Sequence, residues 1–573
     1  MRKGLLILGI NHGGHDASAA IMRDGELIAA CEQERYTRDK HSRAFPSDAI
    51  RDCLLQSSCA IEDLAEIAYA FDPIMHIQEA YLRPALQNPE RIQRIIDDAE
   101  RIRDTFLVEK LIRQETGFNG PISYRNHHLC HLASAYFPSG FDDAVLTSYD
   151  GIGEVESGVI AVGRQGKIEV VHNETIFPDS LGLLYSAVTY FLGWQHHCDE
   201  GIVMGLATYG DPDRQIPGDH RSYSEVFGEI VELNRESYGY RINRDWISYH
   251  RERNTWVSPQ FSSVFGEKRE ASAEITQHHM NIAAALQKRI EEVVLSDLRR
   301  VKEETGLRRL CMAGGVALNC SLNGKVEKAK IFDEVFVQPA SGDAGTAVGA
   351  CYLASAEITS RPMPERHHNF YLGSGYSNND INTAIEQHGL ESYRPDDLFE
   401  STAEELEQGK IVGWFQGRAE FGPRALGNRS ILTRPFPASM KDYLNEKVKF
   451  REVFRPFAPA ILYEYLNEYF DISQESPHML IACEATELGR ERIPATVHVD
   501  NSCRVQSVRR ENNARFYGLL QAFHNRTGCP VLLNTSFNVK GQPIVNSPTE
   551  AIKCYLGTNI DCLAIGDFLL TKD

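Results

Sequence analysis

Two histidines and two aspartates in this chain have the types and positions expected of a divalent-metal site. His127 and His131 are four residues apart in an alanine-rich, helix-compatible stretch, which places both imidazoles on one helical face. Asp150 ends the apolar segment AVLTSYD, where a carboxylate needs a partner, and Asp343 lies in a glycine-flanked turn before a helix. The four side chains therefore predict a metal site, whereas His128 points about 100° away on the same helix and has another role.

The ligand types indicate which metals this site would favour. Two imidazoles with carboxylates suit iron(II), zinc or manganese better than calcium or magnesium. Two histidines at this spacing are by themselves more often structural than metal-binding. The aspartates at matching strand ends, Asp150 and Asp343, are what favour the metal interpretation.

A cluster of basic residues in the C-terminal part predicts a phosphate pocket. The chain as a whole has a net charge of −19, yet nine basic residues and only four acids lie between residues 418 and 455. Guanidinium groups recognise phosphate through paired hydrogen bonds, and glycines at 417, 422 and 427 would permit close backbone approach. The nine are Arg418, Arg424, Arg429, Arg434, Lys441, Lys447, Lys449, Arg451 and Arg455.

Two similar segments must position the candidate metal ligands. Residues 5–32 and 144–171 each read as an apolar strand, a polar glycine-rich turn, a second strand, a tight turn and a third strand. The tight turns are Asp24-Gly25 and Gln165-Gly166. A duplicated unit of this kind, with an acid and glycines in its turn, is the plan of the actin-like ATPase fold. We therefore expect an α/β protein whose N-terminal domain has a duplicated actin-like fold.

The segments around these two units read as helices and an irregular insertion. Ile74–Glu115 is charged and helix-periodic, and we expect breaks at Pro84 and Pro89. Tyr209–Ala271 is polar, aromatic and irregular, which suits the wall of an acceptor site, and a long helix follows over Glu274–Glu304.

Glycine-rich turns between strands and helices recur before the predicted domain boundary. Leu310–Lys325 and Val335–Ala354 each read as a strand, a glycine-containing turn and a helix, a pattern that presents backbone amides to a ligand. The boundary itself lies in Thr359–Asn379, which is rich in Pro, Gly, Ser and His. Beyond it KIVGWFQG reads as a strand. Leu532–Asn538 reads as a strand that ends in a polar cluster fit to hold a nucleotide or a small carbonyl group.

Composition and charge exclude several classes of protein. A net charge of −19 and a pI near 5.6 argue against broad binding to nucleic acid or to an anionic membrane. The apolar run at the start ends at Asn11, too early for a signal peptide, and no stretch approaches the ~20 apolar residues that span a bilayer. The 13 cysteines contain no C-x-x-C pair. We expect a cytoplasmic protein with reduced thiols.

These motifs together resemble the O-carbamoyltransferases of the NodU/CmcH type, a family that includes antibiotic-tailoring enzymes. The resemblance covers nearly the whole chain, and the number and order of the shared motifs make chance agreement implausible. The most specific segments are HDASAA, HHLCHLASAY, YDGIGE, MGLATYG, GGVALN, GRAEFGPRALGNRS, FRPFAP and LNTSFN.

The resemblance implies two catalytic domains. Residues 1–358 would form an actin-like carbamoyl-transfer domain similar to the tRNA threonylcarbamoyl transferases, and 372–573 a YrdC-like α/β domain, joined by a linker at 359–371. The C-terminal domain would convert carbamoyl phosphate and ATP into a carbamoyl-adenylate. The N-terminal domain would then transfer the carbamoyl group to a hydroxyl of a small natural-product acceptor, with the help of an iron-like metal.

The resemblance also assigns roles to individual residues. It places His127, His131, Asp150 and Asp343 on the family's metal ligands and His15 near the transfer centre, where His15 could take the proton of the acceptor hydroxyl. Lys449 and Arg451 match a K-x-R signature with a catalytic role. The expected contacts to substrate or nucleotide are Arg418, Arg424, Arg455, Arg504, Asn319, Ser536 and Asn538, the last two forming an S-x-N signature.

The expected ligands follow from these roles. The metal would be Fe(II), with ATP and carbamoyl phosphate as co-substrates and Mg²⁺ accompanying ATP. The partner would be a hydroxylated small molecule, with no nucleic acid and no membrane, and a homodimer is left open. The chain departs from the family at Ile202, where a lysine is usual, and this puts the standard contacts at that position in question.

Two other functions compete with this interpretation. A tRNA threonylcarbamoyl-adenosine-type transferase shares the N-terminal fold and the metal motif, but an RNA-binding enzyme should carry a basic stripe. A non-catalytic actin-like ATP switch would need neither the metal ligands nor the basic cluster. A carbamoyl-phosphate-dependent release of pyrophosphate would distinguish the main hypothesis from both.

Overall fold

The computed structural model describes residues 4–252, 254–359, 366–367, 369–449, 452 and 454–572. They divide into two compact units, and each is described by itself. The first unit comprises Met1–Gln33, His41–Leu318 and Lys330–His367, and the second comprises Glu34–Lys40, Asn319–Ala329 and His368–Asp573. Within the predicted linker, residues 360–365 and 368 lie outside the described residues.

The first unit begins with a five-stranded mixed sheet. The strand order is β3-β2-β1-β4-β5; β1, β2 and β3 are antiparallel neighbours, whereas β4 and β5 run parallel to β1. Asp24 and Gly25 join β2 to β3 with φ of 52° and 90°, as the predicted two-residue turn requires. The strands are β1 (Leu6–Asn11), β2 (Ser18–Arg23), β3 (Glu26–Glu32), β4 (Glu66–Tyr69) and β5 (Ile122–Tyr124).

A second sheet in this unit repeats the same topology. Its order, β12-β11-β6-β7-β8, is the first order read from the other end, with β6, β7 and β8 antiparallel and β11 and β12 parallel to β6. Gln165 and Gly166 again have positive φ, 49° and 77°. The duplication predicted from the sequence is therefore confirmed. The strands are β6 (Asp143–Tyr149), β7 (Glu156–Arg164), β8 (Lys167–Ile176), β11 (Arg309–Ala313) and β12 (Glu334–Val337).

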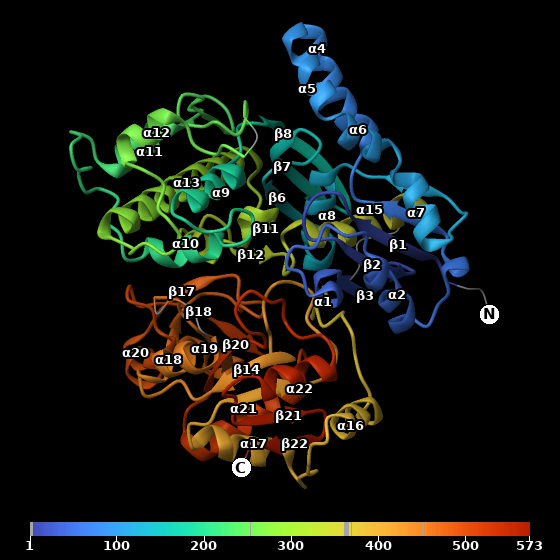
Figure 1. Ribbon diagram of the computed structural model, residues 1–573, viewed down its shortest axis with the longest axis vertical. Coiled ribbons are helices and arrows are strands. Elements are labelled where there is room, and N and C mark those ends of the chain that lie inside the picture. Colours follow the sequence, from blue (N-terminus) through green and yellow to red (C-terminus); the bar gives the residue numbers. More distant parts are fainter. Residues whose placement is uncertain are drawn as a thin grey trace. The chain divides into compact units, whose positions relative to one another are not determined.

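Two helices pack together between the two sheets and carry the candidate metal ligands. Helix α8 (His127–Ser139) contacts β6 and β11, and α15 (Thr346–Thr359) contacts β1 and β2 (Figure 1). Gly349 lets them approach closely, because a Cβ there would lie 1.8 Å from the carbonyl oxygen of Cys130. This close packing brings the start of α8 near the turn before α15.

Short helices form an arm of the first unit, and one predicted break in this segment is wrong. The chain stays helical from α3 (Pro73–His76) through a π-helical turn, Ile77–Leu82, into α4 (Arg83–Gln87). Pro84 is accommodated because it lies in the first turn after the π-helical turn, where a missing N–H is tolerated. The break at Pro89 is confirmed. The arm continues with α5 (Ile92–Asp97), α6 (Ala99–Phe106) and α7 (Val108–Thr116) (Figure 1).

The insertion after the second sheet is irregular, as predicted, and packs on a long helix. The predicted helix over Glu274–Glu304 is α13 (Gln277–Thr305), and α10 (Glu200–Ala207) and α11 (Tyr223–Ile230) pack against it. The remaining elements here are α9 (Leu181–Phe191), β9 (Val231–Leu233), β10 (Tyr240–Ile242) and α12 (Pro259–Phe265).

The second unit is built on a seven-stranded mixed sheet of order β19-β15-β20-β14-β13-β21-β22. The predicted strand KIVGWFQG is β13, and the strand predicted within Leu532–Asn538 is β20. The strands are β13 (Val412–Phe415), β14 (Arg429–Thr433), β15 (Ala458–Leu462), β19 (Gln506–Val508), β20 (Val531–Ser536), β21 (Cys562–Ile565) and β22 (Phe568–Thr571). A smaller sheet contains β16 (Phe470–Asp471), β17 (Ala482–Ala485) and β18 (Ser502–Arg504).

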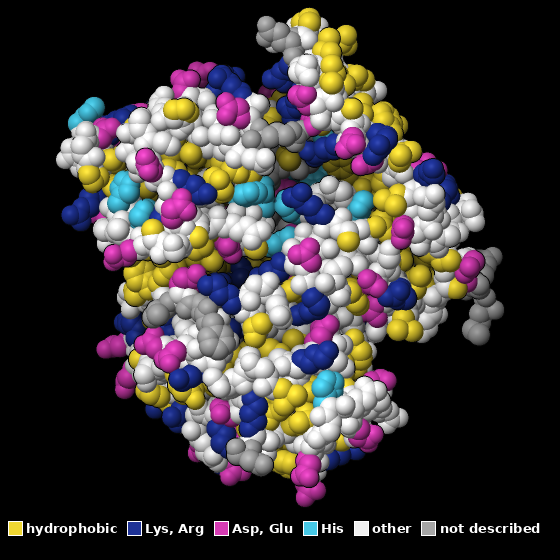
Figure 2. Space-filling model, in the orientation of Figure 1, with side chains coloured by type: hydrophobic (Ala, Val, Ile, Leu, Met, Phe, Trp, Pro, Cys, Tyr) yellow, Lys and Arg dark blue, Asp and Glu magenta, His cyan; other side chains and the backbone are white. Residues whose placement is uncertain are grey.

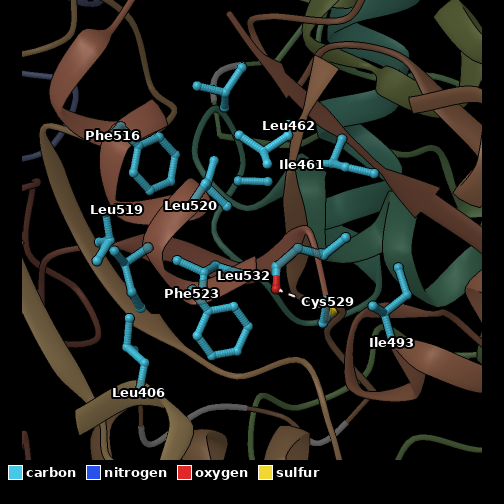
Figure 3. Close-up of a cluster of buried hydrophobic side chains, with 14 of the residues drawn as sticks. Leu406, Ile461, Leu462, Ile493, Phe516, Leu519, Leu520, Phe523, Cys529 and Leu532 are labelled. Carbon is cyan, nitrogen blue, oxygen red and sulfur yellow. Dashed lines mark hydrogen bonds between the residues drawn. The ribbon is translucent and has the colours of Figure 1, made fainter. Parts of the chain in front are cut away.

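Helices cover both faces of the large sheet. Val412 and Trp414 of β13 point into one apolar core and Phe415 into the other, as the two-residue period of a strand requires. Figure 3 shows the first core, where Phe516, Leu519 and Phe523 approach strand residues such as Leu532. Its helices include α17 (Leu398–Glu407) and α21 (Ala514–Thr527), and the other core lies under α16 (Asn378–Gln387), α18 (Met440–Leu444) and α22 (Pro548–Leu556).

Two further helices of the second unit are α14 (Cys320–Lys328), which contacts β17, and α20 (Glu487–Arg492). A search of the described part of the chain for a membrane-spanning helix, one both long and apolar enough, finds none.

Candidate metal centre and anion site

The start of α8 positions the two histidines. Asn126 is the N-cap, and its side chain accepts a hydrogen bond of 2.9 Å from the backbone N–H of Leu129. The helix then holds His127 and His131 one turn apart, both buried. The two Nε2 atoms are 3.0 Å apart, so both rings point toward one place, as the spacing predicts.

Asp150 follows directly after β6 and is held from two sides. Its Oδ1 accepts the backbone N–H of Gly315 at 2.8 Å, and its carbonyl accepts the hydroxyl of Ser180 at 2.9 Å. Gly314, with φ of 83°, allows this approach, since a Cβ there would lie 2.3 Å from the carbonyl oxygen of Tyr149. The predicted Gly314-Gly315 turn thus serves to position a carboxylate.

The four predicted metal ligands converge. One donor atom from each of His127, His131, Asp150 and Asp343 lies within 4.8 Å of all the others. Asp150 Oδ2 is 3.1 Å from His127 Nε2 and 3.3 Å from His131 Nε2, and Asp343 Oδ1 is 3.7 and 3.8 Å from the same two atoms. Two ligand atoms each about 2.1 Å from one ion and at right angles would be about 3 Å apart. The spacing and the donor types therefore fit a divalent metal.

The same four side chains also determine the charges at the candidate metal centre. Burial disfavours a charged His127, but its hydrogen bond to Asp150 and the charges of Asp343 and Asp150 outweigh burial and raise the pKa of His127 to about 9. Burial opposes ionisation of Asp150 too, yet the two histidines hold its pKa well below the usual range. Two carboxylates facing two imidazoles form a centre that attracts a cation.

His128 has the separate role that the sequence predicts. Its Nδ1 lies 2.9 Å from the hydroxyl of Ser148, and its Nε2 lies 2.9 Å from the carbonyl oxygen of Glu156. Complete burial, together with the nearby His127 and His131, lowers the pKa of His128 to about 3. The ring therefore ties α8 to strands β6 and β7 as a neutral group.

Glu154 is a buried carboxylate that sequence reasoning missed. It accepts hydrogen bonds from the backbone N–H groups of Asp72 (2.7 Å) and His127 (3.0 Å) and from the side chain of Asn126 (3.0 Å). Burial raises the pKa of Glu154 to about 7, although these hydrogen bonds and the charge of His127 lower it. The carboxylate fixes the first turn of α8 and hence the ring of His127. The only sequence signal for Glu154 was the YDGIGE motif, of which Glu154 is the last residue.

His15 lies beside the metal ligands, as the resemblance implies. Its backbone N–H is 3.4 Å from Asp343 Oδ2, and its ring centroid is 4.8 Å from that of His197. Arg43 Nη2 lies 3.2 Å from His15 Nε2, and because an arginine only donates, this nitrogen accepts and carries a lone pair.

A charged pair that the sequence did not indicate lies beside His15. Asp16 Oδ1 and His41 Nδ1 are 2.7 Å apart. Burial opposes the charge on His41, but the bonds to Asp16 and Cys198 prevail and raise the pKa of His41 to about 11. Asp16, His41 and His197 all have positive φ, of 52°, 54° and 59°, which non-glycine residues rarely adopt. Strained backbone of this kind is concentrated at functional sites.

Ile202, where the family resemblance leads one to expect lysine, is buried in α10 with 5 % of its surface exposed. An apolar side chain fits this environment without a partner, whereas an ammonium group would need one.

In the second unit the K-x-R and S-x-N signatures meet. The ammonium group of Lys449 donates to Asn538 Oδ1 at 2.9 Å and to the hydroxyl of Ser536 at 3.3 Å, and it also contacts the carbonyl oxygens of both residues. Lys449 is buried, with 4 % of its surface exposed. Arg451 lies outside the described residues.

Three of the predicted arginines form a cationic cluster. Burial and the charges of Arg504 and Arg455 lower the pKa of Arg424 to about 9. The Nε atoms of Arg424 and Arg504 are buried and have no hydrogen-bond partner among the described residues. Arg455 Nη1 is 3.7 Å from Glu452 Oε2. Clustered guanidinium groups with unused buried donors are suited to an anion such as phosphate.

Other basic residues of the predicted cluster are used inside the fold, so the cluster is not one pocket. Arg418 donates to the carbonyl oxygens of Gly373 and Leu372, and Arg434 to that of Glu407. Arg429, fully buried, donates to backbone carbonyls and stacks 3.7 Å over the ring of Phe415. Sequence patterns do not separate such arginines from ligand-binding ones, because backbone carbonyls and phosphates attract the same donors.

Asn319 caps α14 in the second unit. Its side chain accepts the backbone N–H of Leu322 at 3.0 Å, which is the ordinary role of asparagine at a helix start. The nucleotide contact implied for Asn319 by the family resemblance stays a prediction.

Glu420 organises the loop that bears Arg424, and sequence reasoning missed it. One oxygen of this buried carboxylate accepts the backbone N–H groups of Leu426 (2.7 Å), Asn428 (2.8 Å) and Arg429 (3.0 Å). From β20, Asn534 binds the carbonyl oxygen of Ala425 at 3.2 Å. The loop is thus fastened over the same strand that ends in Ser536.

Comparison with known proteins agrees with the motifs. The family model described as carbamoyltransferase N-terminus matches residues 6–352, and that described as carbamoyltransferase C-terminus matches 403–572. The chain is 36% identical to the uncharacterized protein sll1178 of Synechocystis sp., over 99% of this chain and 96% of the relative.

Two other relatives carry functional names. The nodulation protein NolNO of Sinorhizobium fredii is 39% identical over 97% of this chain and 79% of the relative. The 3'-hydroxymethylcephem-O-carbamoyltransferase of Streptomyces clavuligerus is 34% identical over 52% of this chain and 55% of the relative. The resemblance to the NodU/CmcH type is therefore confirmed: the chain belongs to the carbamoyltransferase family and is a carbamoyl-transferring enzyme.

Proposed function

We propose that this protein is an ATP-dependent O-carbamoyltransferase that activates the carbamoyl group in its second unit and transfers it in its first. The observation that carries the proposal is the convergence of His127, His131, Asp150 and Asp343 at the junction of two duplicated sheets. The buried cations of the second unit support it, because they provide a separate site with the opposite charge preference.

The activation step would take place where the second unit offers cations. Carbamoyl phosphate loses phosphate to water, and the carbamate oxygen attacks the α-phosphorus of ATP and displaces pyrophosphate, which leaves a carbamoyl-adenylate. Arg424, Arg455 and Arg504 would hold the departing phosphate groups. Lys449, held by Ser536 and Asn538, would offset the negative charge that develops on the phosphoryl oxygens.

The transfer step would take place in the first unit. The acceptor hydroxyl attacks the carbamoyl carbon, AMP leaves and a carbamate ester forms. His127, His131, Asp150 and Asp343 would hold a divalent metal, with Fe(II) as the expected ion. When bound, such an ion supplies Lewis-acid polarisation of the carbamoyl carbonyl or a contact to the adenylate phosphate.

His15 would receive the proton of the acceptor hydroxyl. A general base needs a lone pair within reach of that proton. The contact with Arg43 identifies Nε2 of His15 as the nitrogen that bears the lone pair, and the acceptor hydroxyl would take the place of Arg43 to reach it. The contact between the His15 backbone and Asp343 holds this ring beside the four converging side chains.

Pyrophosphate release gives a direct test. The metal-replete protein should release pyrophosphate from ATP only when carbamoyl phosphate is present, without any acceptor being needed for a first turnover. Absence of this release, in protein whose metal content has been verified by mass spectrometry, would contradict the proposal.

A further inference from the structure

We infer that the helical arm of the first unit is a dimerisation surface, which packs against the same arm of a second copy of this chain. The arm comprises residues 73–106, from the start of α3 to the end of α6. The inference goes beyond the proposed function, because none of the residues assigned to the two candidate sites lies in the arm.

The arm is a helical hairpin. Its first leg runs from α3 through the π-helical turn to α4, and its second leg comprises α5 and α6. The hydroxyl of Tyr81 in the first leg donates to Asp98 Oδ2 in the second at 3.2 Å, and α3 contacts α6. The legs therefore lie side by side and run in opposite directions. Figure 1 shows the arm extending away from the rest of the first unit, with α4 at its far end.

The first leg has one buried face and a second apolar face that is exposed. Tyr81 and Ala85 are buried, whereas the residue that follows each of them, Leu82 and Leu86, is exposed. Leu82 and Leu86 lie on one face of the leg because they are four residues apart. The side chain of Leu86 is among the most accessible, at 86 % exposed. A helix that is apolar on two faces is normally buried on both, so this leg lacks a partner on its outer face.

The second leg contributes a matching pair of apolar side chains. Ile92 and Ile96 are four residues apart in α5, and both are exposed. Ile96 follows the half-buried Ile95, which shares a face with Asp98. Because the legs are antiparallel, side chains one residue beyond the inner-facing ones lie on the same side of both legs. We call this set the apolar stripe: Leu82, Leu86, Ile92 and Ile96.

The arm has the size and the surface of a protein–protein interface. Figure 2 shows hydrophobic side chains along it, and Ile74 and Phe106 are exposed in addition to the apolar stripe. Contiguous exposed apolar patches are uncommon on monomeric proteins and mark interaction sites. A stable interface uses about 20–30 residues of each partner, and residues 73–106 are enough to supply them.

The charges of the arm favour a second copy of the chain as the partner. The whole chain has a net charge of −19, but residues 79–104 contain five arginines and six acids. Some of these are paired within the arm, as Arg83 is with Glu79 at 2.7 Å and Arg103 with Asp104 at 2.9 Å. A nearly neutral surface that carries both signs can face its own copy across a two-fold axis without net repulsion.

Two such hairpins can pack as a four-helix bundle. The apolar stripes of the two copies would form the centre of the bundle, and the paired charges would lie at its rim, as in other protein interfaces. Each arm would then bury the face that it leaves exposed in the single chain.

A lipid surface fits the arm less well than a second copy does. Helices that lie on membranes carry an excess of Lys and Arg on the polar face and commonly Trp or Phe on the apolar one. In the arm the acids balance the arginines, and residues 82–96 contain neither Trp nor Phe.

The first test is the mass of the full-length protein in solution. Sedimentation velocity and light scattering would be measured from about 1 to about 100 µM, which spans micromolar dissociation constants. We expect twice the chain mass at the upper end of this range. A protein that stays monomeric throughout would overturn the inference.

Variants locate the interface on the arm. Leu86→Asp combined with Ile96→Asp should weaken dimerisation by at least about 100-fold, because two carboxylates would be placed at the centre of the bundle. The matched control is Leu55→Asp, an exposed leucine on α2 (Ser47–Gln56), which should leave dimerisation unchanged. Circular dichroism and thermal unfolding verify that each variant is folded. Unchanged dimerisation in the folded double variant, or equal loss in Leu55→Asp, would show that the arm is not the interface.

Vesicles of phosphatidylcholine and phosphatidylglycerol test the lipid alternative. We expect no cosedimentation of the unmodified protein, because the apolar stripe is covered in the dimer. Cosedimentation that is lost in the Leu86→Asp, Ile96→Asp double variant would mean that the arm binds lipid, and the assignment of a second copy would be wrong. None of these measurements depends on carbamoyl chemistry, so the inference and the proposed function fail or stand separately.

Discussion

The candidate sites of the two units differ in the charge of the ligand that their buried side chains favour. In the first unit two carboxylates, Asp150 and Asp343, face two imidazoles, a set that suits a cation. In the second unit Arg424 and Arg504 bring buried donors without partners among the described residues, a set that suits an anion. Buried charge is unfavourable unless it is compensated. The comparison thus indicates that the two sites favour ligands of opposite charge.

The two sites share one construction principle. In each, a buried glutamate accepts several backbone N–H groups and fixes the segment that bears the functional side chains. Glu154 holds the start of α8, and Glu420 holds the loop around Arg424. The difference between the sites therefore lies in the side chains presented and not in how the backbone is held.

The largest expected effect separates activation from transfer. Lys449→Met should lower carbamoyl-phosphate-dependent pyrophosphate release about 100- to 1000-fold, because it removes a preorganised charge from the phosphate site. Metal content should not change. The matched control is Lys447→Met, since the Lys447 side chain is 42 % exposed and pairs with Glu446 at 3.0 Å. Equal loss of activity in both variants would show that Lys449 has no special role.

Asp150→Asn is the corresponding change in the first unit. Losing this carboxylate should lower carbamoyl transfer by about 100-fold or more, since even partners outside the ligand set change metal sites by 10- to 100-fold. Metal content, measured by mass spectrometry, should fall, whereas pyrophosphate release should remain. Asp143→Asn, on the exposed first residue of the same strand, is the control. Full metal occupancy in Asp150→Asn would contradict the ligand assignment.

The arginine cluster predicts a weaker, substrate-specific effect. Arg504→Gln should raise the KM for carbamoyl phosphate about 10- to 100-fold, the usual effect of losing a hydrogen bond to a charged group. Arg510→Gln, an exposed arginine in the same segment, should not. Steady-state pyrophosphate assays would measure both. If Arg504→Gln changed only kcat, the phosphate would not be bound by this cluster.

The two glutamates allow a comparison of the scaffolds. Glu154→Gln and Glu420→Gln should each destabilise the protein by about 1–3 kcal/mol in urea unfolding, because an amide oxygen accepts backbone N–H groups more weakly than a carboxylate oxygen does. At position 154 the new NH2 group would also face donors such as the side chain of Asn126. Only Glu154→Gln should also weaken metal binding, which titration calorimetry would detect. A matching loss of metal affinity in Glu420→Gln would show that the sites are not held independently.

The smallest effect concerns pH. The pKa of His41 is raised to about 11, so its contribution to stability is complete below its unfolded value near 6.5 and is lost as pH rises toward 11. The stability difference between the unmodified protein and His41→Gln should therefore shrink between about pH 7 and about pH 9, by at most about 1.4 kcal/mol per pH unit. Urea unfolding at both values measures it. A difference that grew with pH would contradict a charged His41.

What could be predicted from the sequence depended on local patterns. The duplicated strands and turns could be read because period-two apolar segments and Asp-Gly or Gln-Gly turns are short-range signals. His127 and His131 followed from helical spacing, and Asp150 and Asp343 from their places at strand ends. The same kind of pattern predicted the strand KIVGWFQG, which is β13, and the polar end of β20.

The remaining features depend on contacts between distant segments. Whether an arginine meets a backbone carbonyl, as Arg418 and Arg429 do, or stays available, as Arg424 does, is decided by tertiary packing. The pairing of Asp16 with His41 likewise arises from two unusual backbone conformations that no local pattern indicates. Pro84 shows the reverse case, where a π-helical turn absorbs a residue that local rules expect to break the helix.

The most direct test of the division between the two units is the detection of carbamoyl-adenylate in Asp150→Asn protein. The variant would be mixed with ATP and carbamoyl phosphate, quenched and examined by mass spectrometry. If activation occurs in the second unit and transfer in the first, the adenylate should accumulate to about one equivalent per enzyme. If the Asp150→Asn protein forms no adenylate while Asp143→Asn protein does, activation needs the metal cluster and the account of two separate sites is wrong.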